Sequence, residues 1–85
     1  MEKRIGILAI IIEDRESVPK ANSILSDYAS IIIGRMGIPY KEKHINVISI
    51  IVDGTTDEIG ALSGKLGNLT GVTAKTVLAK KNQGK

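Results

Sequence analysis

Apolar and polar positions divide the chain into apolar runs, which have the character of strands, and two amphipathic segments. Residues 3–12, KRIGILAIII, form a nearly continuous apolar run that ends at the polar stretch EDRES. Isoleucine dominates this run, and β-branched residues favour extended structure. The pattern therefore predicts a first strand over residues 3–12.

The segment after EDRES has the spacing of an amphipathic helix. Its apolar residues recur three and four positions apart, namely Val18, Ala21, Leu25, Tyr28, Ala29 and Ile32. Ser17 can cap such a helix, and Pro19 is tolerated in the first turn because the amide hydrogen that proline lacks is not needed there. We expect a helix over residues 18–29.

Two further apolar runs follow, with a polar connection between them. Residues 31–36 and residues 45–53, INVISIIVD, are predicted as the second and third strands, joined by a loop or hairpin turn. In GRMGIPY, residues 34–40, the glycines and the proline indicate a strand that bends and ends. Strand alternation places Arg35 on an apolar face, so we expect either a bulge at Gly34 that turns it outward or a charged partner at an interface.

The second amphipathic segment is GTTDEIGALSGKLGNLTG, in which Thr55 and Glu58 have the spacing of a capping box. Its apolar positions are Ile59, Leu62, Leu66 and Leu69. We expect this helix to close at Gly67 or Asn68. We also expect the glycines at positions 60, 64 and 67 to let the helix approach the sheet closely. Residues 72–79, VTAKTVLA, are predicted as a shorter last strand.

The element order βαββαβ predicts an α+β fold, the ferredoxin-like sandwich of a four-stranded antiparallel sheet with two helices on one face. We expect residues 1–79 to form a single domain of this kind. Residues 80–85, KKNQGK, are expected to be a flexible, basic C-terminal tail.

The first and third strands are apolar on both of their faces. An antiparallel sheet with one hydrated face alternates apolar and polar residues, and these strands do not. An uncovered apolar face marks an interface, so we expect a homodimer or a tetramer. The expected interface residues are Leu8, Ile10, Ile12, Ile48, Ile50, Val52 and Arg35.

Composition favours association as well. A chain of 85 residues builds only a modest core, and without cysteine it has no disulfide to reinforce that core. No apolar run reaches the roughly 20 residues of a membrane span. The basic and apolar N-terminus superficially suggests a signal peptide, but cleavage would remove the first strand. We therefore expect a cytoplasmic protein that does not enter a membrane.

The net charge of +3 arises at the C-terminal end of the chain. Of the twelve Lys and Arg residues, three lie in residues 80–85, which leaves nine basic residues against nine acidic ones. A basic tail of this kind is more typical of a solubilising end than of a nucleic-acid contact. Direct nucleic-acid binding is not expected.

Few residues are candidates for catalysis. RNA-recognition domains stack bases on aromatic side chains of the sheet, and this chain has no Phe or Trp. Copper-chaperone relatives need a CxxC pair, which is missing. Arg15 follows the first strand, as an acylphosphatase-like phosphate site requires, but three acidic residues surround it. His44 is the only histidine and has no neighbouring nucleophile or metal ligand. We expect no enzyme activity, no cofactor and no metal site.

Two segments carry a resemblance to a known family. GRMGIPY after the second strand, and VDGTTDEIGALSGKLGNLTGV from the third strand to the fourth, are similar to the iron-only hydrogenase system regulators. That family is grouped with ACT-like domains, near the C-terminal effector domain of the nickel-responsive repressor. The resemblance implies a regulatory, ligand-sensing or assembly domain that oligomerises and affects genes or enzymes of hydrogenase maturation. The first hypothesis is a homo-oligomeric regulatory domain that senses a small ligand at the subunit interface.

The resemblance has limits that follow from particular residues. The nickel repressor binds its metal through histidines and a cysteine, and this chain has one His and no Cys. ACT domains that bind amino acids commonly have a glycine in the loop after the first strand, and EDRESVPKAN has none. Neither nickel nor an amino acid is therefore carried over as the ligand.

The resemblance and the residue types together give a candidate ligand site. Its expected residues are Arg15 and Val18 after the first strand, and Arg35, Met36 and Gly37 in the second strand. The alternative is a structural subunit that senses nothing and docks onto a protein partner through its sheet. A small hydrolase that depends on Arg15 is the third hypothesis.

Overall fold

The chain folds as four strands and two helices in the predicted order, and the computed structural model describes residues 2–80. The elements are β1 (Lys3–Ile12), α1 (Ser17–Asp27), the 3-10 turn η1 (Ala29–Ile31), β2 (Ile32–Tyr40), the 3-10 turn η2 (Lys41–Lys43), β3 (Ile45–Thr55), α2 (Thr56–Gly67) and β4 (Val72–Leu78). Apart from residue 80, the predicted C-terminal tail lies outside the described residues.

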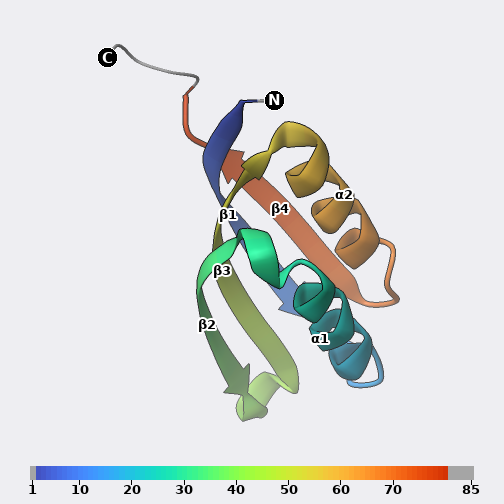
Figure 1. Ribbon diagram of the computed structural model, residues 1–85. Helices are drawn as coiled ribbons and strands as arrows, with labels where there is room; N and C mark the ends of the chain where they lie inside the picture. Colours follow the sequence, from blue (N-terminus) through green and yellow to red (C-terminus); the bar gives the residue numbers. More distant parts are fainter. Residues whose placement is uncertain (1, 81–85) are drawn as a thin grey trace.

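The strands form one antiparallel sheet in the order β2-β3-β1-β4. Both helices lie on the same side of this sheet, as Figure 1 shows. The α+β, ferredoxin-like prediction is therefore confirmed. Because β1 and β3 are the central pair, with Leu8 opposite Ile50 and Ile10 opposite Ile48, the two most apolar strands lie where burial is greatest.

The second strand is longer than predicted. It continues through Gly37 and Pro39 to Tyr40, where the sequence indicated an end near residue 36. Proline is tolerated because β2 is an edge strand. The outer side of an edge strand faces no other strand, so the amide hydrogen that proline lacks is not needed there. The predicted loop therefore shrinks to η2 and His44, between the end of β2 at Tyr40 and the start of β3 at Ile45.

The two helices begin in different ways. In α2 the predicted capping box is present, since the Thr55 hydroxyl accepts from the Glu58 amide and the Glu58 carboxylate accepts from the Thr55 amide. In α1 the predicted cap is wrong, because Ser17 is the first helical residue and Glu16 precedes it without a side-chain cap. The Ser17 hydroxyl is buried and donates to the Thr70 carbonyl at 2.6 Å. It links the start of α1 to the connection before β4.

The core lies between the sheet and the helices. Its sheet side consists of Leu8, Ile10, Ile12, Ile48, Ile50 and Val52, each at most 6% exposed. These are six of the seven residues predicted to form the oligomer interface, and for them that prediction is wrong. The apolar faces of the helices cover them, with Leu25, Leu62 and Leu66 among the buried partners. Both faces of the central strands are apolar, so residue type did not identify the covered one.

The glycines of α2 do not have the predicted role. A Cβ built at Gly60, Gly64 or Gly67 meets nothing within 4 Å, so these glycines allow no close approach to the sheet. A glycine is required instead at Gly71, where φ is 69° and a Cβ would lie 2.8 Å from the Asp14 Cβ. This contact packs the loop after β1 against the start of β4.

Candidate functional site

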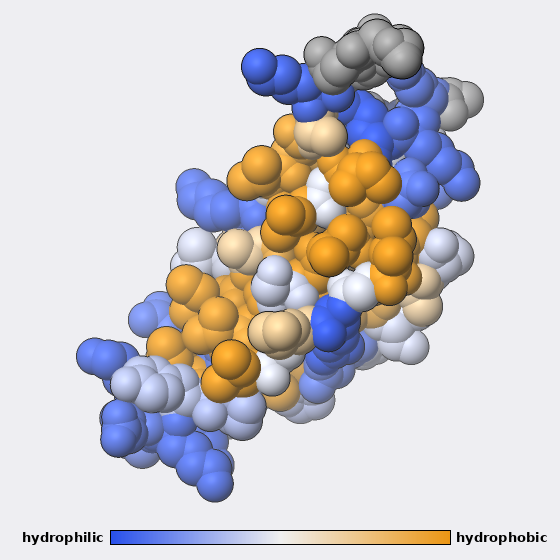
Figure 2. Space-filling view, turned by 90° about the vertical axis from the view of Figure 1, so that its left-hand side faces the viewer, coloured by the Kyte–Doolittle hydropathy of each residue, from blue (hydrophilic) through white to orange (hydrophobic). Residues whose placement is uncertain are grey.

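The face of the sheet opposite the helices, here called the open sheet face, is apolar and uncovered. Its large side chains and their neighbours at the sheet edge are 38–67% exposed: Ile5, Ile7, Ile11, Ile33, Met36, Ile38, Tyr40, Val47, Ile51 and Val77. All four strands contribute to this set. Figure 2 shows the apolar side chains gathered over the middle of the molecule, with polar groups mainly around them. Contiguous apolar surface of this kind is typical of an interaction site.

Arg35 is turned away from that face by a bulge in β2. The β2–β3 register shifts between Ile32, opposite Val52, and Gly34, opposite Ile51. Arg35 then pairs with the buried Ile50 and lies on the helix side of the sheet. The predicted bulge is therefore present. It directs Arg35 toward α1, so this residue does not line the open sheet face, as the interface prediction required.

At this edge Arg35 contacts a neutral side chain. Its Nη2 donates to the Asn22 Oδ1 on α1 at 2.7 Å. This hydrogen bond joins the helix to the edge strand, and the neutral amide of Asn22 does not compensate the guanidinium charge. The contact orients Arg35 without neutralising it, which is the arrangement that suits recognition of an anion.

A small cavity of about 120 Å³ lies beside this pair, between α1 and the β2–β3 hairpin. It is lined by Val18, Asn22, Arg35, Gly37, Ile38, Pro39, Asn46 and Ile48. Three of the five predicted ligand residues, Val18, Arg35 and Gly37, therefore meet at one place. Met36 does not, because strand alternation puts it opposite Ser49, and it is 67% exposed.

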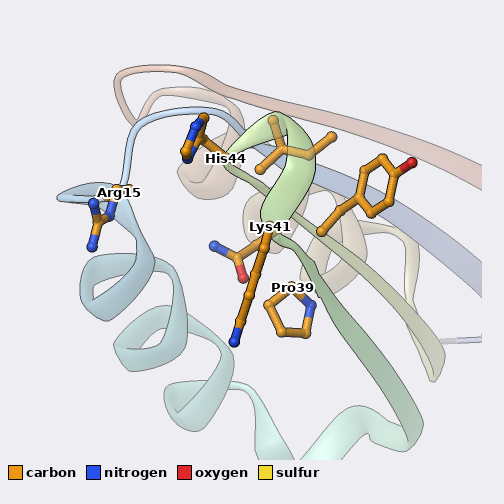
Figure 3. Close-up of a pocket in the computed structure, with 7 residues that line it drawn as sticks. Arg15, Pro39, Lys41 and His44 are labelled. Atoms are coloured by element: carbon orange, nitrogen blue, oxygen red, sulfur yellow. The ribbon is translucent and has the colours of Figure 1, made fainter.

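A larger cavity of about 410 Å³ adjoins the small one and contains the fourth predicted residue, Arg15. Its lining is Arg15, Pro39, Tyr40, Lys41, His44, Ile45 and Asn46, so Pro39 and Asn46 belong to both cavities. Figure 3 shows Arg15 next to the start of α1, with Lys41 and His44 coming from the end of the hairpin. We call the two cavities together the basic groove.

The charge of the groove has one sign. Arg15, Arg35, Lys41 and His44 line it, and no Asp or Glu among the described residues does. Glu13, Asp14 and Glu16 flank Arg15 in the sequence and Glu42 lies in the hairpin turn, but none of these four acidic residues lines either cavity. Asp14 accepts from the Glu16 amide at 3.0 Å, and Glu42 accepts from the Tyr40 hydroxyl at 3.1 Å.

The loop that carries Arg15 is fixed on both sides. The Glu13 amide donates to the Gly71 carbonyl at 2.7 Å, and the Ser17 amide donates to the Asp14 carbonyl at 2.9 Å. The buried Ser17 hydroxyl adds the contact to Thr70. Arg15 therefore extends from a loop whose backbone is held by neighbours at the far end of the chain.

Lys41 and His44 were not expected as site residues. Both lie in the polar connection that the sequence predicts between the second and third strands, and both are exposed. Only the extension of β2 to Tyr40 brings this turn alongside the start of α1. A run of Lys, Glu, Lys and His in a hairpin turn was the available signal, and it is common in turns of no particular function.

The described residues contain neither a metal-binding cluster nor a membrane-spanning helix. Within residues 2–80, no three His, Asp or Glu side chains lie close enough together to hold a metal ion. None of the helices in the described part of the chain is both long and apolar enough to cross a membrane.

Comparisons with known proteins identify a family and structural relatives. A model for TM1266-like proteins, described as "Iron-only hydrogenase system regulator, putative", matches residues 4–76. The solved structure of the uncharacterized protein TM1266 from Thermotoga maritima is 42% identical, with a TM-score of 0.88 over 93% of this chain and 100% of that one.

A second structure, of an unknown protein from Galdieria sulphuraria, has a TM-score of 0.63 and 13% identity. It aligns with 96% of this chain and 48% of its own length, and at this identity the likeness shows the fold alone. No curated protein matches the sequence.

Proposed function

The chain belongs to the TM1266-like family of iron-only hydrogenase system regulators, and from this premise we propose that it is a homo-oligomeric, ACT-like regulatory domain that responds to a small effector. The family match confirms the resemblance indicated by GRMGIPY and by the segment from β3 to β4. The family description concerns regulation, so the proposal is a binding function without catalysis.

The open sheet face is the observation that carries the proposal. Four strands of 10, 9, 11 and 7 residues, about 4.8 Å apart and rising about 3.4 Å per residue, cover about 600 Å² in projection. Projecting side chains add to this area, and a stable interface of ordinary size buries about 800 Å² on each partner. The face is therefore large enough for a specific dimer.

A second copy of the chain is the occupant that fits this face. Two sheets pack with their faces about 10 Å apart when apolar side chains interdigitate. A two-fold axis brings the same patch from both subunits together, so each isoleucine meets an apolar surface like its own. Burial of the face would also supply the apolar contacts that 85 residues cannot provide within one chain.

The geometry favours binding over reaction. The only histidine of the chain, His44, makes no hydrogen bond to a serine, threonine or carboxylate among the described side chains. A nucleophile needs such a base beside it. The groove instead offers cations and amides, which hold a ligand without transforming it.

The test is native mass spectrometry of the purified protein and of Ile7→Lys, whose side chain is 46% exposed on the open sheet face. We expect the unmodified protein to be a dimer or tetramer. A two-fold interface would bury two new lysines, one from each subunit, so the variant should dissociate, with a dissociation constant raised at least about 100-fold.

The matched control is Ala61→Lys, which places the same charge at an exposed position of α2. It should leave the oligomer intact, and circular dichroism should show both variants folded. A monomeric unmodified protein would contradict the proposal. An Ile7→Lys protein that keeps its oligomeric state would place the interface elsewhere and leave the open sheet face for a different protein partner.

A further inference from the structure

We propose that the basic groove binds a small polyanion, a phosphorylated or polycarboxylate metabolite, in contact with Arg15, Lys41 and His44. The inference rests on the proposed function, to which it adds the chemistry of the effector. It goes beyond the residues that the sequence indicated, because Lys41, His44 and the amides of Asn22 and Asn46 enter only through the fold.

The first support is the gathering of like charge. Arg15 comes from the loop after β1, Arg35 from β2, and Lys41 and His44 from the hairpin turn, so three separate segments place cationic or donor groups around one space. The recorded side-chain hydrogen bonds of the described residues do not involve Arg15, Lys41 or His44. Like charges repel, and an anion placed among them makes charge-assisted hydrogen bonds to several at once.

The second support is the backbone of His44. Its φ of 58° and ψ of 37° lie in the left-handed region, and no other non-glycine residue between positions 2 and 80 has a positive φ. Glycine adopts this conformation more easily than any residue with a side chain. The chain nevertheless places an imidazole there, in the lining of the larger cavity. Strain at a position that displays a polar side chain is a recognised mark of function.

The third support is rigidity. Arg35 is held by Asn22, and the Arg15 loop is held by the Gly71 and Thr70 carbonyls. A site whose backbone is fixed before the ligand arrives loses less entropy on binding. Both ends of the groove therefore have supports that come from α1 and from the connection between α2 and β4.

The size and lining of the groove fit a ligand with a short carbon or phosphate skeleton. The larger cavity, about 410 Å³, is within the usual range for small-molecule sites. Pro39 and Ile45 supply an apolar wall, and the half-buried Asn46 lies where the two cavities meet. Charged groups at one end and Arg35 at the other suit an anion with charges at two separated positions.

The test is isothermal titration calorimetry at low ionic strength, with inorganic pyrophosphate and citrate as the two probes. At least one should bind the unmodified protein. Lys41→Ala should weaken that binding by about tenfold or more, as loss of one charge-assisted hydrogen bond predicts. The matched control is Lys43→Ala, which removes an equal charge from the same turn but does not line the groove. It should change the affinity by less than about threefold, because exposed charges are screened by water.

His44→Gly should change thermal stability and probe affinity in opposite directions. Relief of the left-handed strain should raise the melting temperature, while the lost imidazole weakens binding of the same probe. A purely structural role for His44 would leave the affinity unchanged. The ratio of the two probe affinities distinguishes a phosphate ligand from a carboxylate one.

The inference is overturned if neither probe binds, or if Lys43→Ala weakens binding as much as Lys41→Ala does, since the attraction would then be diffuse. The groove is lined by one chain, so the monomer produced by Ile7→Lys should bind the probe as well as the oligomer does. Binding by a protein that never oligomerises would leave this inference standing and remove the assembly from the proposed function. An oligomer that binds neither probe would leave the assembly in the proposed function and remove this inference.

Discussion

The two faces of the sheet are made of nearly the same side chains and have opposite surroundings. Ile50 and Ile51 are neighbours in β3, yet Ile50 is fully buried and Ile51 is 43% exposed. In β1, Ile10 is fully buried and Ile11 is 38% exposed. The covered face supports the fold of one chain, whereas the open sheet face is available to another.

This difference shows that side-chain type did not decide burial. The strand propensity and the hydrophobicity of isoleucine are the same on either face of the sheet, so they do not select the face that is buried. The helices break the symmetry, since α1 and α2 bring apolar side chains to one face only. The open sheet face keeps apolar area that the single chain cannot remove from water.

The largest difference between the two faces is expected when Ile50 and Ile51 are each replaced by alanine. Ile50→Ala should lower the free energy of unfolding by about 3 kcal/mol at every protein concentration, because it leaves a cavity in the core. Ile51→Ala should have a comparable effect only at concentrations at which the protein is assembled, and a smaller one when it is monomeric. Urea denaturation at two concentrations about 100-fold apart measures both. Equal, concentration-independent losses would remove the distinction between the faces.

A smaller effect is expected from weakening the helix that covers the sheet without touching the core. Thr55→Ala removes the hydroxyl of the capping box and should lower the free energy of unfolding by about 1 kcal/mol. Thermal denaturation provides the measurement. Thr56→Ala, at the next and exposed position, is the control and should be close to neutral. If Thr56→Ala lowers the free energy of unfolding as much as Thr55→Ala does, loss of the capping box is not the cause of the destabilisation.

The smallest effect is a gain. Gly64→Ala on the exposed side of α2 should raise the free energy of unfolding by about 0.5–1 kcal/mol, since a Cβ there meets nothing and alanine favours the helix. The oligomeric state should not change. A variant that is less stable, or that dissociates, would show that α2 and not the open sheet face contacts the neighbouring subunit. Denaturation and native mass spectrometry on one sample give both answers.

The candidate site was only partly accessible from the sequence. Arg15, Val18, Arg35 and Gly37 could be selected because loop and strand ends carry binding residues, and the structure brings them to one groove. Met36 could not be separated from them, since the bulge that resets the alternation depends on pairing with β3. Lys41 and His44 could not be selected, because their position next to α1 depends on the length of β2.

The sequence by itself determined the element order, the capping box of α2, the apolar character of both sheet faces and the family. These features follow from local spacing and residue type, which act over a few positions along the chain. The tertiary structure alone decided which face is covered, where Arg35 points and which cations share the groove. Each of these depends on contacts between segments far apart in sequence, as the pairing of β1 with β4 and of Ser17 with Thr70 shows.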